Sequence, residues 1–450
     1  MRDWVPERHM VHFILEAIEK LDLSCFRLNW RGTGSEQYPP SMMLALLVYC
    51  YATGRFGSRR IEEATYSDVI VRYICANHHP DHDTICAFRR KNDELFKEMF
   101  VKVLAMASEL GVLKKVGTIS VDGTKIHANA SKHAAVSYKR AGQMIEQLQM
   151  EVDALVKKAE QADATPLDEG LSIPEEISRR QDRIAKLEKA KAVIEDRFDQ
   201  IHKEKQAEYE AKMKTRQDSR GAGKKPRGSD PKPPKDEPEE KAQYNFTDPD
   251  SRIMKAGRSV AFEQSYNAQA VVDAEGSYLI LGQRVTNHSN DKEELKPTLE
   301  TVNEGFREVE EVLADSGYFS EKAISDIEGD DRVTVYAAVD KQPHGRTVAD
   351  LEVQADPDRP HEDCSVKETM QWRLQTKKGK DRYKLRKQTV EPVFGIIKQA
   401  MGFRQFNLRG SPKAELEWNL VSLAYNVRRM FNLVEEESLP ESGWLQNYAL

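Results

Sequence analysis

The chain has 450 residues, of which 39% are hydrophobic and 32% are charged, and its formal net charge is −6. This length predicts roughly two to three domains, and the weakly acidic balance excludes nucleic-acid binding through overall charge, so any such contact must come from local basic patches. The chain shows no signal peptide and no CxxC pair, and its most apolar run, residues 42–52, is far shorter than the ~20 residues of a membrane helix. We therefore expect a cytoplasmic protein with no membrane partner.

Residues 1–115 have the pattern of an all-helical domain. Apolar residues recur at helical spacing in "MVHFILEAIEKL" and "SMMLALLVYCYA", and "DHDTICAFRRKNDELFKEMFVKVLAMASELG" predicts a turn followed by helices that end at Gly111. Arg89 and Arg90 belong to a small basic cluster in this region. The cluster favours a DNA-binding module over a helical bundle with a solvated basic face.

A group of cysteines and histidines in "CANHHPDHDTIC" has the outer spacing of a zinc site. Its members are Cys75, His78, His82 and Cys86. Only three residues separate the two histidines, whereas zinc fingers leave about 12 residues between their ligand pairs. We therefore interpret the segment as a turn before a helix that begins at Asp83 or Thr84.

Residues 138–214 predict a coiled-coil insert. Apolar residues recur every seven positions in two series, one around Ile145 and the other around Leu187. We expect an antiparallel helical hairpin, and the sequence leaves open whether its helices pair within one chain or between two chains of a homodimer or higher oligomer. Residues 215–243 contain five prolines, many charges and almost no apolar residues, which predicts a disordered linker.

The remaining segments, residues 116–137 and 244–435, alternate between strand and helix patterns. "TISVDGTKIHANA" predicts a first strand, and "QSYNAQAVVD" and "YLILGQRVT" predict a hairpin. "EVLADSGYFS" and "DRVTVYAAV" predict two further strands, with helices between them and again after residue 371. Pro392 removes one hydrogen bond of the late helix, which predicts a kink or a restart there. The fold class is therefore α+β: an all-helical domain followed by a mixed α/β domain that the helical insert interrupts.

Three carboxylates occupy positions at which an α/β sheet places active residues. Asp122 lies within the first strand or at its end, Asp315 follows a later strand, and Glu391 lies on the late helix. Taken singly, each fits a turn, a helix cap or a salt bridge. Together they would repel one another at a cost of several kcal/mol unless a cation lay between them. Mg²⁺ takes such oxygen ligands, and two ions about 3.5–4 Å apart bind both oxygens of a phosphoryl transfer, so the set predicts a two-metal site.

Basic residues surround the last carboxylate and the first strand. The stretch from Lys377 to Lys387 holds seven cations in eleven residues. The cations that we expect to bind DNA phosphates in this part of the chain are Lys125, Arg386, Lys387, Lys398, Arg404 and Arg409. Lys125 and the neighbouring His127 fit equally well as strand residues that face another element. Lys387 and Lys398 have helical spacing from Glu391, which predicts one shared helical face.

In this order, the segments resemble those of bacterial insertion-sequence transposases with an RNase H-like DDE catalytic domain. The similarity spans nearly the whole chain and is carried by "HPDHDTICAFRR", "SVDGTKIHANASKH", "TDPDSRIMKAG", "SYNAQAVVD", "LADSGYFS" and "YKLRKQTVEPVFGIIKQAMGFRQFNLRG". The match places the two aspartates of the family at Asp122 and Asp315 and its glutamate at Glu391. Tyr383, Arg386, Glu391 and Lys398 match the tyrosine–arginine–glutamate–lysine signature, except that four residues instead of three separate the arginine from the glutamate.

The resemblance implies an enzyme that cuts DNA at the ends of an element and joins the freed 3′-hydroxyl to target DNA. It implies that Asp122 bridges two Mg²⁺ ions, for which Mn²⁺ can substitute, and that Asp315 and Glu391 each hold one of them. An inactive DNA-binding remnant and a nuclease of the same fold that cuts without joining are alternatives. A structural coiled-coil protein is a weaker one, because the heptads cover under a fifth of the chain.

Overall fold

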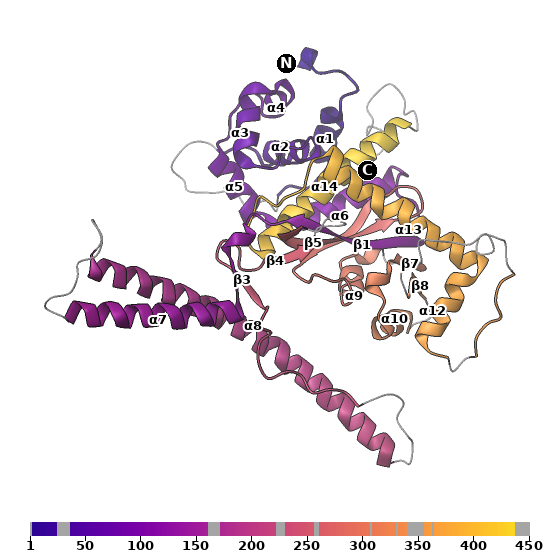
Figure 1. Ribbon diagram of the computed structural model, residues 1–450. Helices are drawn as coiled ribbons and strands as arrows, with labels where there is room; N and C mark the ends of the chain where they lie inside the picture. Colours follow the sequence, from indigo (N-terminus) through magenta and orange to yellow (C-terminus); the bar gives the residue numbers. More distant parts are fainter. Residues whose placement is uncertain are drawn as a thin grey trace. The chain divides into compact units, whose positions relative to one another are not determined.

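The computed structural model describes residues 2–24, 37–160, 172–221, 230–255, 261–306, 308–329, 332–339, 355–361 and 364–436 (Figure 1). The chain divides into two compact units. The first combines Met1–Asn129 with Ile253–Leu450, and the second is Ala130–Arg252. Cys25 and the sequence "DATPLDEG" lie outside the described residues.

One mixed sheet is the centre of the first unit (Figure 1). Its strands among the described residues are β1 (Thr118–His127), β4 (Arg252–Lys255), β5 (Phe262–Asp273), β6 (Ile280–Thr286), β7 (Glu311–Ala314) and β8 (Thr334–Ala337). The order is β4-β5-β1-β7-β8, and β6 pairs with β5. The β5–β6 hairpin and the strands β1, β7 and β8 were expected from the alternation of apolar residues, and the mixed sheet confirms the predicted fold class.

The register between β1 and β7 determines where two of the predicted carboxylates lie. The two strands are parallel, and Val121 pairs with Ala314. The next residue on each strand is a predicted site residue, Asp122 on β1 and Asp315 after β7. Parallel pairing therefore brings both aspartates to the same edge of the sheet, at the end of the β1–β7 ladder.

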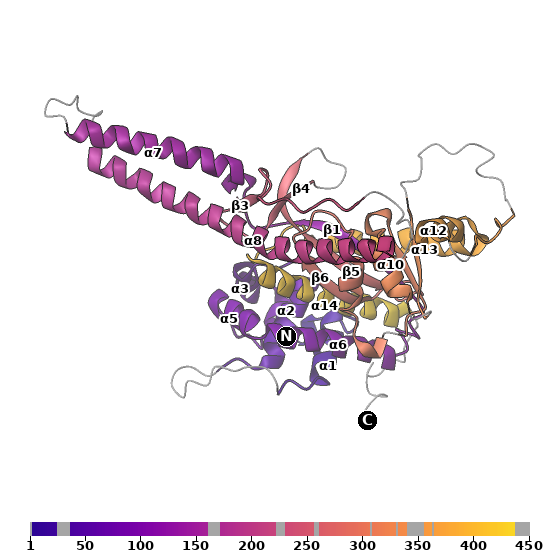
Figure 2. The same ribbon diagram turned by 90° about the horizontal axis from the view of Figure 1, so that it is seen from below.

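Helices before and after the sheet pack into the same unit (Figure 2). The amino-terminal helices include α1 (Met10–Glu19), α2 (Pro40–Ala52), α3 (Ser58–Ser67), α4 (Val69–Ile74), α5 (His82–Lys91) and α6 (Asp93–Glu109), and α14 (Ser411–Glu436) lies against α2, α6 and β6. The apolar run 42–52 is buried along α2, so it is a core helix. No helix of the described residues combines the length and apolarity needed to cross a membrane. The expected 1–115 domain therefore shares one compact unit with the sheet.

A buried polar network joins the amino-terminal helices to α14. The Arg89 Nη1 donates to the Tyr51 hydroxyl at 2.6 Å, and that hydroxyl lies 3.5 Å from Glu417 Oε1. The backbone N–H groups of Asn407 and Leu408 donate to the other oxygen of Glu417 at 2.8 and 3.0 Å. Arg89 is only 2% exposed. The prediction that Arg89 contacts DNA is therefore wrong, because the side chain stabilises the protein core.

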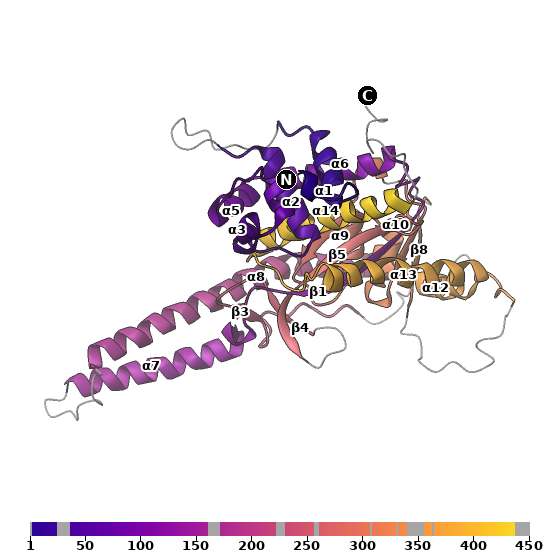
Figure 3. The same cartoon turned by 90° about the horizontal axis from the view of Figure 1, so that it is seen from above.

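The carboxyl-terminal helices lead to the site. They are α12 (Val366–Gln375), α13 (Lys377–Gly395) and a π-helical turn, η5 (Ile396–Ala400), and α13 lies along β1 (Figure 3). The predicted restart at Pro392 is wrong, because α13 continues through this residue and the irregular turn comes four residues later. There the N–H of Met401 donates to the Ile396 carbonyl, and π turns of this kind re-aim the side chains that follow.

The second unit contains the helical hairpin. Helix α7 (Tyr138–Glu160) packs on α8 (Ile173–Gly221), beside a small sheet of β2 (Ala135–Ser137) and β3 (Gln243–Asn245). Tyr138 contacts Glu195, and Arg180 contacts Glu151, so the two helices run antiparallel within one chain. Helix α8 continues to residue 221, so part of the linker that we predicted to be disordered is helical.

The insert should be removable without unfolding the sheet. Strands β1 and β4 are both neighbours of β5, so the ends at residues 129 and 253 are about two strand spacings apart, or ~10 Å. We expect a chain in which eight Gly and Ser residues replace 130–252 to retain a cooperative thermal transition and a mixed α/β circular dichroism spectrum. Loss of the cooperative transition would show that the insert belongs to the core.

Candidate active site

Asp122 and Asp315 form the centre of the site. Asp122 lies on β1 with 19% of its side chain exposed, and its Oδ1 accepts the backbone N–H of Gly123 at 2.8 Å. Asp315 caps the short helix η4 (Ser316–Tyr318), where the Gly317 N–H donates to its Oδ1. Each aspartate thus accepts a backbone N–H, Asp122 within β1 and Asp315 directly after β7.

Arg386 connects Asp122 to Glu391. Its Nη1 lies 3.6 Å from Asp122 Oδ2, and its Nη2 lies 3.5 Å from Glu391 Oε1. The arginine side chain is only 10% exposed, whereas that of Glu391 is 54% exposed. Arg386 is therefore the basic partner of Glu391, a role for which the sequence also offered Lys387. Arg386 is buried inside the site, whereas Lys387, the next residue on the same helix, is exposed.

Burial of Asp122 changes its proton affinity. Burial raises the pKa of Asp122 to about 7, Arg386 opposes the rise, and Asp315 and Asp291 add to it. Burial, together with Asp315 and Asp291, thus outweighs the guanidinium in its effect on Asp122. A site with this imbalance favours the binding of a further cation.

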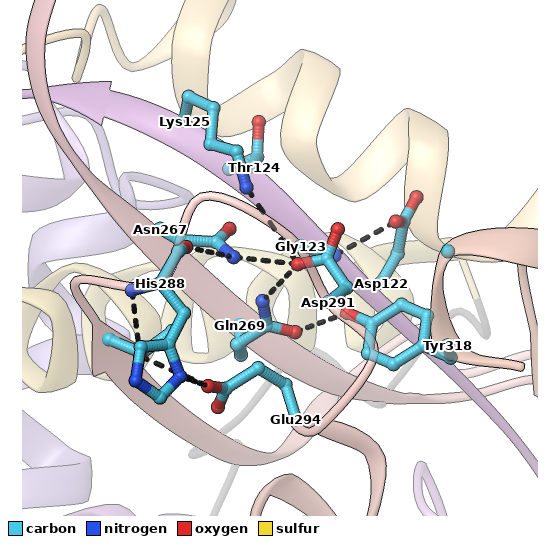
Figure 4. Close-up of polar contacts among 12 residues, drawn as sticks. Asp122, Gly123, Thr124, Lys125, Asn267, Gln269, His288, Asp291, Glu294 and Tyr318 are labelled. Carbon is cyan, nitrogen blue, oxygen red and sulfur yellow. Dashed lines mark hydrogen bonds and ion pairs between the residues drawn. The ribbon is translucent and has the colours of Figure 1, made fainter. Parts of the chain in front are cut away.

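A fourth carboxylate, Asp291, lies at the site and was missed by the sequence analysis (Figure 4). It lies in the loop after β6, where the Asn267 and Gln269 side-chain amides donate to its Oδ1 at 2.6 and 2.8 Å. Gly123 leaves the space for this group, since a Cβ at that position would come within 2.9 Å of Asp291 Oδ1 and closer still to Gln269 Nε2. The signal in the sequence was the alternation of two amides in the otherwise apolar run of residues 266–272, because buried amides need partners.

Two lysines lie beside these carboxylates. The Lys125 Nζ is 3.7 Å from Asp291 Oδ1, and the Lys398 Nζ donates to Thr124 Oγ1 at 2.5 Å and to the Lys125 carbonyl at 3.0 Å. Burial lowers the pKa of both amines, and Lys125 adds to the effect on Lys398. The structure thus brings two of the predicted DNA-binding cations into the immediate surroundings of Asp122.

Comparison with protein families identifies the chain. The family model described as "Transposase DDE domain" matches residues 231–427, and the one described as "Transposase domain (DUF772)" matches residues 1–91. The chain belongs to the DDE transposases. Neither the curated proteins nor the solved structures gave a match. The matched DDE region includes Asp315 and Glu391 but begins after Asp122, which lies before the helical insert.

DDE transposases use divalent metal ions, and the carboxylates of this transposase fit such an ion. Among the residues that the structure describes, no three His, Cys, Asp or Glu side chains are grouped so as to enclose a metal. Mg²⁺ is commonly bound through only one or two carboxylates, with waters and substrate phosphates completing its shell. Asp122 and Asp315 could supply these two ligands, and Glu391 lies across Arg386 from them.

Transposases bind DNA, and the remaining predicted DNA-binding residues of this one are exposed. The side chains of Arg90 and Lys387 are exposed to solvent. Arg404 donates to the Lys398 carbonyl at 3.1 Å, and Arg409 donates to the Asn129 carbonyl at 2.9 Å. Both arginines are exposed in the segment after η5.

The basic stretch on α13 separates into two faces. Four exposed lysines, Lys377, Lys380, Lys384 and Lys387, are spaced by three or four residues and continue to Glu391 with the same helical period. We call these four residues the lysine stripe. Lys378 and Arg382 lie off this line and bind Glu311 at 3.1 and 2.8 Å. At 1.5 Å per residue the stripe and Glu391 extend over about 21 Å of helix.

The metal-free protein should become less stable as the pH rises through the neutral range. The folded pKa of Asp122, about 7, is above its ordinary value of 3.8, so the unfolded chain releases this proton first. Stability therefore falls between about pH 4 and pH 7 and levels off above it. We expect Asp122→Asn to remove this loss and to stabilise the protein by roughly 2–3 kcal/mol more at pH 8 than at pH 5.

Urea denaturation in the presence of EDTA, at both pH values, measures this difference. Asp381→Asn is the matched control, since Asp381 is 62% exposed on α13 and its replacement should leave the pH dependence unchanged. If Asp122→Asn raises the free energy of unfolding by the same amount at both pH values, the result contradicts the raised pKa of Asp122.

Proposed function

We propose that this transposase is catalytically active and performs metal-dependent DNA strand cleavage followed by strand transfer of an insertion-sequence element. The observation that supports this most is the meeting of Asp122 and Asp315 at the ends of paired parallel strands, with Glu391 joined to Asp122 through Arg386. A divalent ion at these carboxylates would polarise the scissile phosphate and activate the attacking oxygen.

The residues around the carboxylates suit a phosphate substrate. Arg386 offers donors between Asp122 and Glu391. Lys125 on β1 and Lys398, which reaches β1 from η5, are partly buried cations. In the cleavage step, water attacks phosphorus and the bond to the 3′-oxygen breaks, which leaves a 3′-hydroxyl. In the transfer step, the oxygen of that hydroxyl forms a new bond to a target phosphorus. The bond from this phosphorus to the target's own 3′-oxygen breaks, which leaves a 3′-hydroxyl on the target strand. Both steps develop negative charge that the fixed cations stabilise.

Substitution of the aspartates should abolish cleavage without abolishing DNA binding. We expect Asp122→Asn and Asp315→Asn to lower cleavage by about 10³-fold, because a lost ligand for a polarising ion costs several kcal/mol of transition-state stabilisation. Their DNA affinity should stay the same or rise slightly, since each change removes one negative charge. Asp326→Asn is the control here, because Asp326 is 45% exposed and lies outside the basic stretch of α13.

The assay uses DNA that flanks the gene for this chain, a circular target plasmid and Mg²⁺ or Mn²⁺, with products separated on a denaturing gel. Cleaved strands joined to the plasmid support a transposase. Cleavage without joined products would indicate a nuclease of the same fold. Binding of the flanking DNA without any cleavage by the wild-type chain would indicate an inactive remnant.

The lysine stripe should account for much of the salt dependence of DNA binding by the catalytic part. Removing one cation that binds a phosphate lowers the slope of log K against log salt by about 0.9. We expect Lys380→Gln and Lys384→Gln each to lower the slope by roughly this amount and to weaken binding across sequences. Lys378→Gln is the control, because Lys378 lies on the same helix but binds Glu311. Equal slopes for all three variants would exclude the stripe as the DNA track.

A further inference from the structure

We propose that Asp291 is a positioning residue that holds the Lys125 ammonium beside Asp122, where it binds a phosphate of the DNA. This inference rests on the proposed function, since it assigns a role within the same site. It concerns a carboxylate outside the Asp122, Asp315 and Glu391 set, and it starts from a cation whose hydrogen bonds are incomplete.

Lys125 is a cation without adequate protein partners. Its side chain is only 18% exposed, and its Nζ is buried without a hydrogen-bond partner among the described residues. Its ion pair with Asp291 spans 3.7 Å, which is longer than a hydrogen bond. An ammonium has three donors, and leaving them unsatisfied is costly. The phosphate oxygens of a bound DNA strand are acceptors of the kind that this position lacks.

Asp291 is held firmly enough to position that cation. Asn267 and Gln269 both donate to its Oδ1, and both amides are buried on β5 (Figure 4). The Tyr318 hydroxyl donates in turn to Gln269 Oε1, which ties the amide to the segment that follows Asp315. Because Gly123 has no side chain, Asp291 and its two amide partners can lie directly against β1.

A second network fixes the loop that carries Asp291. Glu294, only 2% exposed, accepts a hydrogen bond from Thr286 at 3.1 Å and pairs with His288 at 2.6 Å and Arg284 at 3.3 Å (Figure 4). The Glu294 N–H also donates to the Asp291 carbonyl at 3.0 Å. The loop is therefore anchored on β6, and its one carboxylate that faces β1 has a defined position.

Lys398 explains why Lys125 needs a fixed counter-charge. Lys398 Nζ donates to the carbonyl of Lys125, and the two ammonium groups repel each other electrostatically. Without an anion nearby, Lys125 would be driven from this position towards solvent. Asp291 keeps it in place before DNA binds, which reduces the reorganisation required when the phosphate arrives.

DNA-binding measurements test this proposal, because it predicts a change in DNA affinity opposite to the change that net charge alone predicts. Asp291→Asn makes the protein more positive, so general attraction predicts tighter DNA binding. We expect weaker binding instead, together with a salt slope lower by about 0.9, equal to that of Lys125→Met. Glu293→Gln is the matched control, because Glu293 is exposed two residues away, and it should bind as tightly as wild type or slightly tighter.

Cleavage kinetics test whether Asp291 acts through Lys125. The probe is a 40-base-pair duplex that spans the boundary of the DNA flanking the gene, with Mg²⁺ as the metal. We expect Asp291→Asn and Lys125→Met each to lower kcat/KM by about 10–100-fold, as for other residues that orient a functional group. The double variant should be no worse than Lys125→Met alone, within about twofold, because the two changes remove one contact.

Three results would overturn the proposal. The first is a double variant whose loss equals the product of the single losses. The second is a raised half-saturating Mg²⁺ concentration in Asp291→Asn but not in Lys125→Met, which would make Asp291 a metal ligand. The third is an Asp291→Asn variant that behaves as Glu293→Gln does. If Asp291→Asn fails to fold by thermal denaturation, Asn267→Ala replaces it, with a smaller loss that is also absent in the Lys125→Met background.

The failure of this inference and that of the proposed function are distinguishable. Cleavage by wild type and not by Asp122→Asn, with no effect of Asp291→Asn, defeats only the role of Asp291. No cleavage by wild type, with the binding result as expected, defeats only the proposed catalytic function.

Discussion

Repulsion between carboxylates at the end of the β1–β7 pair is the constraint around which the site is built. Parallel pairing places Asp122 and Asp315 side by side, and neither position can be moved without shifting the register of a buried strand. The protein responds with fixed positive charge: Arg386 lies between Asp122 and Glu391, and Lys125 lies against Asp291. Burial, with Asp315 and Asp291 adding to it, still outweighs Arg386 and raises the pKa of Asp122. The same imbalance that destabilises the metal-free protein would favour a bound cation.

The buried cations and the exposed cations have different roles. Arg89 and Arg386 are both nearly inaccessible, and each is held by groups of the protein, Arg89 by Tyr51 near Glu417 and Arg386 by two carboxylates. The lysines of α13 that face away from the core have no such role and remain available to solvent. The count of basic residues in a stretch therefore overestimates its DNA-binding surface, because folding uses some of the cations internally.

The sequence could predict the elements and the three carboxylates, because both depend on local patterns. Apolar alternation located β1, β5, β6, β7 and β8, and Asp122 lies within the first of these strands while Asp315 directly follows β7. The burial of Arg89 could not be predicted, since Arg89 and Arg90 are chemically equal neighbours and only the packing of α5 distinguishes them. The two amides on β5 indicated a buried polar partner but did not identify it as Asp291, which is more than 20 residues away along the chain and meets them only after β5 and β6 pair. The π-helical turn after Glu391 likewise arises from packing, since Pro392 predicted an irregularity at a different residue.

The charge distribution also limits how the catalytic part can bind DNA. The chain carries a net charge of −6, and the exposed cations near the site are the lysine stripe with Arg404 and Arg409. Proteins that make 6–10 phosphate contacts lose roughly 10³–10⁵ in affinity between 50 and 200 mM salt, and these contacts carry no direct sequence information. A stripe of this size can therefore guide a strand towards Glu391, but it cannot by itself hold one DNA sequence in preference to another. Discrimination between sequences requires base contacts, and these must come from another surface of the chain or from a second copy.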